Sequence, residues 1–250
     1  MKVITWNVNG IRARHEQVAA LIAEEQPDVV CLQEVKAPID KVPQLLVSAD
    51  DYWAYWHGAG GYSGVALLVR RSFTPEKPVF THPAFDMENR IVVADAGPIR
   101  LASVYVPNGG KDYQAKLGFC EALLAWVAET KDNGQSLLLC GDLNVAREER
   151  DVHPKERKPN QIGTRPEERQ WLAALIDQNM TDVGRALDPD NDELFTWWAP
   201  WRSLRQRNIG WRIDYVLASR ELAATARHAE SKREFGTSDH APVVVTFDWP

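Results

Sequence analysis

The chain has 250 residues, 44% of them hydrophobic, and a formal net charge of −6. This length and composition indicate a globular protein with a large buried core. The first ten residues alternate apolar and polar side chains, and no later segment reaches the roughly 18–20 consecutive apolar residues of a spanning helix. We therefore expect a soluble, cytoplasmic protein with no membrane partner. The net charge argues on average against a polyanionic partner such as DNA, although an average conceals local patches.

Predicted strands and helices recur along the whole chain. Short apolar runs predict β-strands at residues 3–6, 29–33, 64–70, 99–106, 137–141, 213–219 and 242–247. Helical patterns start at residues 16, 115 and 165, and the first of them stops at Pro27. Several strands follow one another with only a turn between them, which favours layered α/β architecture with mixed sheets over a doubly wound parallel sheet. Because no linker or composition break is present, we expect residues 1–250 to form a single domain.

The three cysteines predict no chemistry. Cys31, Cys120 and Cys140 each lie in an apolar stretch, and neither a CxxC nor a CxH spacing is present. Buried, reduced thiols are the expected state, rather than a disulfide, a metal cluster or a nucleophile.

Acidic residues stand at the ends of several predicted strands. Glu34 follows the run VVCLQ, Asp142 follows LLLCG, and Asp214 and Asp239 stand at or near the starts of later strands. One acid at a strand end is usually a solvated turn residue, so no single one of these acids indicates a functional site. The four together do. The repetition suits two similar sheets packed face to face, with the acids gathered at one rim.

Amides and one imidazole accompany these acids, namely Asn7, Asn9, Asn144 and His240. Hard oxygen ligands with amides are what Mg²⁺ prefers, and the lack of clustered histidine and cysteine argues against structural zinc. On an extended segment Asp142 and Asn144 would point to the same side and share one ligand. His240 could donate to a phosphate oxygen if protonated, with the partly buried Asp214 holding its ring. The set therefore predicts a metal-assisted phosphate site.

Six motifs resemble the exonuclease III class of apurinic/apyrimidinic (AP) endonucleases, within the endonuclease/exonuclease/phosphatase superfamily. They are WNVNGIR, LQEVK, VYVPNGG, GDLNVA, NIGWRIDYVLAS and SDHAPV, in family order from residue 6 to residue 243. GDxN or SDH alone is shared with lipid and inositol-phosphate phosphatases and with deoxyribonuclease I relatives, whereas WNVNGIR with GWRIDY is more specific to the DNA-repair branch. The resemblance implies a four-layer α/β sandwich of two packed mixed β-sheets flanked by helices, as in deoxyribonuclease I.

The resemblance also implies roles for individual residues. A metal ion, Mg²⁺ with Mn²⁺ as a substitute, would be held by Glu34, Asn7 and Asp239. The catalytic residues would be Asp142 and Asn144 on the attacking water, Tyr105 and His240 on the scissile phosphate, and Asp214 orienting His240. On the substrate side, an aromatic pocket of Trp197, Trp211 and Ile213 would accept a flipped abasic sugar, with Asn9, Asn108 and Lys111 nearby. Whether one or two metal ions act, and whether Asp142 or a metal-bound hydroxide is the base, stays open.

The expected function is a Mg²⁺-dependent DNA repair phosphodiesterase that cleaves 5′ to abasic sites and trims 3′ ends of duplex DNA as a 3′–5′ exonuclease, acting as a monomer. The basic stretches 157–165 and 201–212, the second interleaved with tryptophans, would meet the DNA despite the net charge. Asn9 and Lys111 stand where some relatives have an acid and an arginine. The alternatives are a relative acting on RNA, inositol phosphate or lipid, and a DNA-binding protein without catalysis. The balance of activities depends on loops at 153–165 and 198–210.

Overall fold

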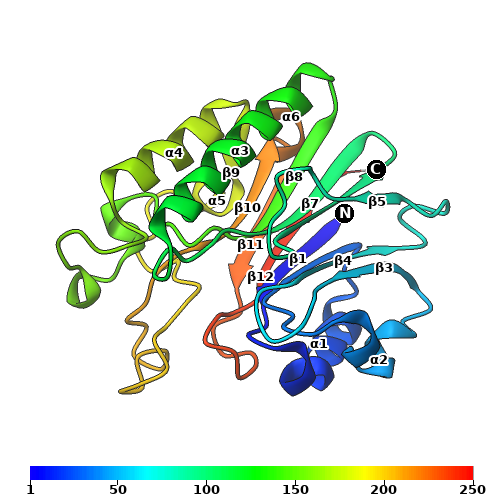
Figure 1. Cartoon of the computed structure of the whole chain (residues 1–250), viewed down its shortest axis with the longest axis horizontal. Coiled ribbons are helices and arrows are strands. Elements are labelled where there is room, and N and C mark those ends of the chain that lie inside the picture. Colours follow the sequence, from blue (N-terminus) through cyan, green and yellow to red (C-terminus); the bar gives the residue numbers. More distant parts are fainter. Residues whose placement is uncertain (250) are drawn as a thin grey trace.

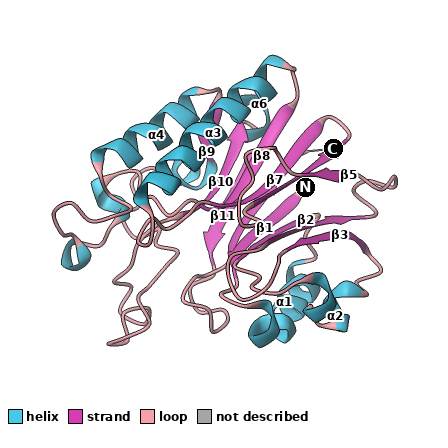
Figure 2. Cartoon of the chain, in the orientation of Figure 1, coloured by secondary structure: helices cyan, strands magenta, loops and turns pink. Residues whose placement is uncertain are grey.

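The computed structural model describes residues 1–249 as two six-stranded sheets packed face to face, with helices on both outer faces (Figures 1 and 2). The first sheet has the order β11 (Ala226–Ser231), β12 (Val243–Phe247), β1 (Lys2–Asn7), β2 (Val29–Gln33), β4 (Val65–Arg70), β3 (Tyr52–His57). The second has the order β5 (Val79–Thr81), β6 (Ile91–Ala96), β7 (Ile99–Tyr105), β8 (Ser136–Asp142), β10 (Asp214–Ser219), β9 (Met180–Asp182). The predicted four-layer sandwich of mixed sheets is confirmed.

Two pairs of helices form the outer layers. On the first sheet lie α1 (Ile11–Glu25) and α2 (Gln44–Val47), and on the second lie α3 (Tyr113–Asp132) and α4 (Pro166–Asp177) (Figure 1). The short helices α5 (Val183–Leu187) and α6 (Arg220–Ala223) flank β9 and β10, and 3₁₀ turns span Ile39–Lys41, Glu149–Asp151 and Pro154–Glu156. Within residues 1–249, no helix is both long and apolar enough to cross a membrane.

Side-chain alternation along each strand builds three apolar layers. In β8, Leu138 and Cys140 pack in the core between the sheets, whereas Leu137 and Leu139 pack in the core beneath α3 and α4. Since both faces are covered, the strand reads as a continuous apolar run. Cys31, Cys120 and Cys140 are buried free thiols, as predicted.

The two sheets repeat one arrangement, and this repetition places the site. A helix connects a parallel strand pair in each sheet, α1 between β1 and β2 and α3 between β7 and β8. Glu34 directly follows β2 and Asp142 ends β8. Parallel strands end at the same sheet edge, so the acids of both sheets meet at one rim of the sandwich.

The seven predicted strands are all present, and the sequence reasoning missed five others among residues 1–249. The missed strands include the sheet edges β3, β5, β9 and β11, together with β6. Edge strands carry polar or exposed residues, as in the ARHAES of β11, and so lack a clear apolar pattern. The start of α1 was also placed too late: it begins at the buried Ile11, after Gly10 at φ 101°.

Candidate active site

A cleft of about 380 Å³ opens at the rim where β2, β7 and β8 end. Most of the predicted site residues line it, and residues 161–163 complete the wall. The lining residues from the prediction are Glu34, Tyr105, Asn108, Asp142, Asn144, Trp197, Trp211, Ile213, Asp239 and His240. Asn7, Asn9 and Asp214 lie behind this lining and bond to it, whereas Lys111 is exposed and outside it.

Asn7 joins the two sheets beneath the cleft. Its Nδ2 donates to Glu34 Oε1 (3.1 Å) and to Asp142 Oδ2 (2.9 Å), and the Tyr105 hydroxyl donates to the same Glu34 oxygen (2.9 Å). The Asn7 amide oxygen accepts from the backbone N–H of Asn9 (3.0 Å). Asn7 is fully buried, so this bonding fixes its amide as a donor to both carboxylates. A role as metal ligand would require the amide to turn, and that role stays a prediction.

Asp142 and Asn144 act as one unit, although not through an extended strand. The strand ends at Asp142, and Asn144 has a left-handed backbone with φ 51°. Its backbone N–H donates to Asp142 Oδ1 (2.9 Å), and its Nδ2 donates to Asp142 Oδ2 (3.3 Å) and to Val106 O (3.0 Å). The two side chains therefore lie together, but the predicted extended geometry is wrong because a tight turn brings them there; that they share one ligand stays a prediction.

His240 is held as predicted by Asp214, which comes from a different strand. His240 Nδ1 lies 2.9 Å from Asp214 Oδ2, and the opposite nitrogen, Nε2, lies 3.8 Å from Asp142 Oδ2. Thr196, which the sequence did not single out, donates from Oγ1 to Asp214 Oδ2 (2.6 Å). Thr196 Oγ1 in turn accepts the N–H groups of Ile213 and Asp214. The carboxylate that orients the imidazole is thus itself fixed.

Burial and mutual charge shift the pKa values of this group. Burial raises the pKa of Asp142 to about 7, and the negative Asp214 and Glu34 add to the effect of burial against the opposing charge of His240. Burial alone would lower the pKa of His240, but Asp214 and Asp142 raise it to about 10. Near neutral pH the imidazole is therefore protonated and the Asp142 carboxyl is close to its own titration point.

Asp239, the third predicted metal ligand, is fixed by Asn9 and Trp197. Asn9 Nδ2 donates to Asp239 Oδ1 (2.8 Å), and Trp197 Nε1 donates to Asp239 Oδ2 (3.0 Å). Lys36, a second residue that the sequence reasoning missed, donates from Nζ to Asn9 Oδ1 (2.7 Å) and lies 2.5 Å from Glu34 Oε2. Lys36 stands inside the LQEVK motif, so a signal for it was available.

The donor set fits a divalent cation. Ligand atoms of Glu34, Asp142 and His240 lie within 4.8 Å of one another, and the carboxylates are the hard oxygen donors that Mg²⁺ and Mn²⁺ prefer. Burial alone would raise the pKa of Glu34, but hydrogen bonds from Lys36 and Asn7 hold it below its usual value. Glu34 is therefore ionised and available as a ligand.

A second cluster, His57, His82 and Asp86, lies elsewhere and has a different geometry. The two imidazole rings stack 4.4 Å apart and within 10° of parallel, so their in-plane lone pairs do not converge on one point. His57 Nε2 lies 2.6 Å from Asp86 Oδ2. This arrangement is a hydrogen-bonded His–Asp pair with a stacked neighbour.

The four tryptophans of the 197–211 segment divide among three environments. Trp197 and Trp211 line the cleft and meet edge to face, with ring centroids 5.9 Å apart. Trp198 is in a separate apolar core, and Trp201 is 59% exposed. Trp211 is only 5% exposed, and its buried Nε1 has no hydrogen-bond partner within residues 1–249. The cleft therefore has an aromatic wall with an unused N–H donor.

Part of the predicted basic surface is not available to DNA. Arg212 is buried and bonds to Asp151 and Asp182, so it is structural. Arg205 donates to three backbone carbonyls. The predicted basic stretch 201–212 thus retains Arg202 and Arg207 as exposed cations.

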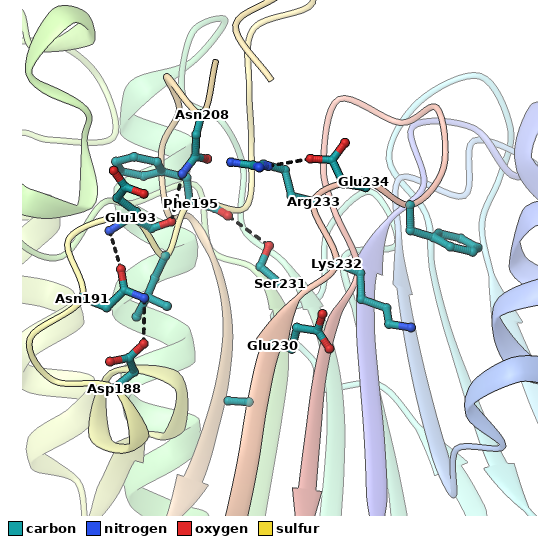
Figure 3. Close-up of a pocket in the computed structure, with 13 residues that line it drawn as sticks. Asp188, Asn191, Glu193, Phe195, Asn208, Glu230, Ser231, Lys232, Arg233 and Glu234 are labelled. Carbon is teal, nitrogen blue, oxygen red and sulfur yellow. Dashed lines mark hydrogen bonds and ion pairs between the residues drawn. The ribbon is translucent and has the colours of Figure 1, made fainter. Parts of the chain in front are cut away.

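A larger hollow, of about 640 Å³, lies away from these groups (Figure 3). Figure 3 shows Asp188, Asn191 and Glu193 on one side and the segment from Glu230 to Glu234 on the other. None of the predicted site residues lines it. Size alone therefore does not locate the chemistry, whereas the converging carboxylates and imidazole do.

The fold and these residues define a phosphoesterase of the two-sheet sandwich type. Residues 4–240 match the Endonuclease/Exonuclease/phosphatase family, and the chain belongs to this family. The exodeoxyribonuclease of Bacillus subtilis (strain 168) is 32% identical over 252 residues, which cover 97% of this chain and 98% of that protein. The DNA repair nuclease APEX1 of Danio rerio is 32% identical, with coverage of 98% and 81%.

Two solved structures extend this comparison. The 3′ phosphatase NExo from Neisseria, bound to a product DNA hairpin, superposes with a TM-score of 0.91 and 32% identity over the whole of both chains. An AP endonuclease from Archaeoglobus fulgidus gives a TM-score of 0.89 and 29% identity, also over both whole chains. The resemblance to the exonuclease III class of AP endonucleases is confirmed.

Proposed function

We propose that the protein is a DNA repair nuclease that uses Mg²⁺ to hydrolyse the phosphodiester 5′ to an abasic site and to trim 3′ ends of duplex DNA. One observation carries the proposal: Asp142, Asn144 and His240, the last held from behind by Asp214, face one cleft that also has an aromatic wall. The named activities of the relatives, exodeoxyribonuclease, AP endonuclease and 3′ phosphatase, support the choice of substrate. All these groups come from one chain, which supports a monomer as the acting unit.

Glu34 would hold the cation, with Asn7 and Asp239 as the other predicted ligands. When bound, a divalent cation neutralises phosphate charge and polarises the phosphoryl oxygen. Asp142 would accept a proton from the attacking water, and Asn144 would position that water. His240, protonated near neutral pH, would donate from Nε2 to a non-bridging oxygen while Asp214 holds Nδ1.

The aromatic wall supports selection of abasic nucleotides. A nucleotide without a base has already lost its stacking, so it costs less to extrude from the duplex. Trp197, Trp211 and Ile213 offer an apolar surface for the sugar, and Trp211 Nε1 is a buried donor with no other partner within residues 1–249. Selection in this pocket would follow shape and would not read sequence.

A cleavage assay tests the proposal. The purified protein is given a duplex with an internal abasic analogue, a duplex with a recessed 3′ end, a single-stranded RNA and an inositol phosphate, each with Mg²⁺ or EDTA. We expect Mg²⁺-dependent cutting 5′ to the abasic analogue together with shortening of the 3′ end. Hydrolysis of RNA or inositol phosphate alone would move the protein to another branch of the family. Binding to duplex DNA without any cleavage would make it a non-catalytic relative.

A further inference from the structure

A fully buried ion pair lies beneath the cleft, between α3 and α4. Lys116 Nζ and Glu168 Oε1 are 2.5 Å apart, and both side chains have no solvent exposure. Removing two charges from water is unfavourable, and apolar replacements of such pairs are often neutral or stabilising. The presence of this pair therefore calls for a reason other than stability.

Both partners hold the backbone of loops that line the cleft. Lys116 Nζ donates to the carbonyl oxygens of Asn144 (2.8 Å) and Asn108 (3.3 Å). Glu168 Oε2 accepts from the N–H groups of Gly163 (2.7 Å) and Arg165 (2.9 Å). The loop after β7, the loop after β8 and the loop before α4 are thereby tied to one pair of charges.

The same three loops carry groups at the reacting centre. Asn108 Nδ2 donates to Asn144 Oδ1 (3.2 Å), and Asn144 bonds to Asp142. Gly163 also lines the cleft, and a Cβ built on it would lie 3.2 Å from both the Asn144 carbonyl oxygen and the Trp211 ring. Because the Gly163 backbone leaves no room for a side chain there, a movement of its loop would displace both Asn144 and the aromatic wall.

We propose that Lys116 and Glu168 are positioning residues, and that their ion pair sets the relative placement of the three cleft loops and hence of Asn108 and Asn144. The inference rests on the proposed function, because the consequence that matters is the rate of DNA cleavage. A misplacement of about 1 Å can cost on the order of 100-fold in rate. Neither Lys116 nor Glu168 is among the residues that line the cleft, and on this proposal neither contacts the substrate.

The experiment compares Lys116→Met, Glu168→Gln and the double variant with Leu172→Ala as a matched control. Leu172 is fully buried on the same helix as Glu168 and packs in the apolar core beneath α3 and α4. For each variant, kcat and KM on an abasic duplex are measured well below the unfolding temperature, together with that temperature.

Each single variant should lower kcat by about 10- to 100-fold with little change in KM. Leu172→Ala should lower the unfolding temperature and keep the wild-type kcat. The double variant should be more stable than either single variant, because neither charge is left unpaired. Its kcat should stay low, because the carbonyls of Asn108 and Asn144 still lack the Lys116 donor. A wild-type kcat in the double variant would overturn the proposal. So would a loss of kcat in Leu172→Ala as large as that in a single charge variant with the same unfolding temperature.

Hydrogen exchange gives a readout that does not depend on activity. The amide protons of Gly163 and Arg165 should exchange faster in Glu168→Ala than in the wild type, and at the wild-type rate in Leu172→Ala. Equal protection in all three proteins would show that Glu168 does not anchor the loop. If the wild-type protein leaves abasic DNA intact, the proposed function is refuted. The hydrogen-exchange measurement would still test whether Glu168 anchors the loop.

Discussion

Replacing Asp142 by Asn should abolish turnover and, in the absence of a divalent cation, stabilise the fold above neutral pH. The carboxyl is buried beside Asp214 and Glu34, and its pKa is raised from 3.8 to about 7. A group whose pKa is raised by folding stabilises the protein at low pH, and this contribution is lost as the pH rises through the folded value. Without a cation, the ionised Asp142 carboxylate therefore destabilises the fold.

The size of the effect follows from the two pKa values. Between about pH 5 and pH 7 the unfolded chain has released the proton of Asp142 while the folded chain retains it. Each pH unit in this window lowers the free energy of unfolding by about 1.4 kcal/mol, so the wild type loses about 3 kcal/mol relative to Asp142→Asn. This pH dependence is independent of the hydrogen bonds that the new amide gains or loses, since those affect all pH values alike.

Urea unfolding of both proteins in EDTA, at several pH values from about 5 to 8, measures the difference. We expect the stability of the variant relative to the wild type to rise with pH by about 3 kcal/mol. Saturating Mg²⁺ should remove most of this gain, because a cation that binds the folded site offsets the charge. If the difference in free energy of unfolding between variant and wild type does not change across this pH range, the raised pKa of Asp142 is refuted. If that difference grows as the pH is lowered, the pKa of Asp142 is shifted in the opposite direction.

Three further substitutions test the remaining parts of the site. Asp214→Asn removes the charge that keeps His240 protonated, so the alkaline limb of the kcat/KM profile should move from near pH 10 toward 6.5; an unmoved limb would reject imidazolium as the donor. Thr196→Val leaves two buried N–H groups unpaired and should destabilise by about 1–3 kcal/mol in urea. Trp211→Ala should destabilise by about 3–5 kcal/mol and reduce cleavage at abasic sites more than 3′-end trimming; equal reductions would assign the ring to the core.

The strand-end acids were predictable because strand periodicity is local. Glu34 and Asp142 each follow a continuous apolar run, and such a run fixes where a buried strand stops. The parallel pairing of β1 with β2 and of β7 with β8 then brings the two ends to one rim. The pairing of His240 with Asp214 was also accessible, since an acid with apolar neighbours needs a partner.

The residues that fix the site from behind could not be predicted in the same way. Thr196 lies in a segment with no periodic pattern, and its bond to Asp214 depends on how that loop crosses β10. Lys116 and Glu168 appear on helices as ordinary charged positions, and only the packing of α3 on α4 makes them a buried pair. Arg212 looked like a DNA contact, yet tertiary structure pairs it with Asp151 and Asp182.

The contrast between these two groups has one physical origin. A residue at the reacting centre must expose a charge at a strand end, and strand ends are visible in the sequence. A residue that positions the centre acts through tertiary contacts, such as the bond from Lys116 to the backbone of Asn144. Its role depends on what surrounds it after folding, and no local sequence pattern marks such a lysine or threonine. The segment GTSDHAP, residues 236–242, contains residues of both groups. Ser238 donates to the backbone carbonyl of Asn7, while Asp239 and His240 face the cleft.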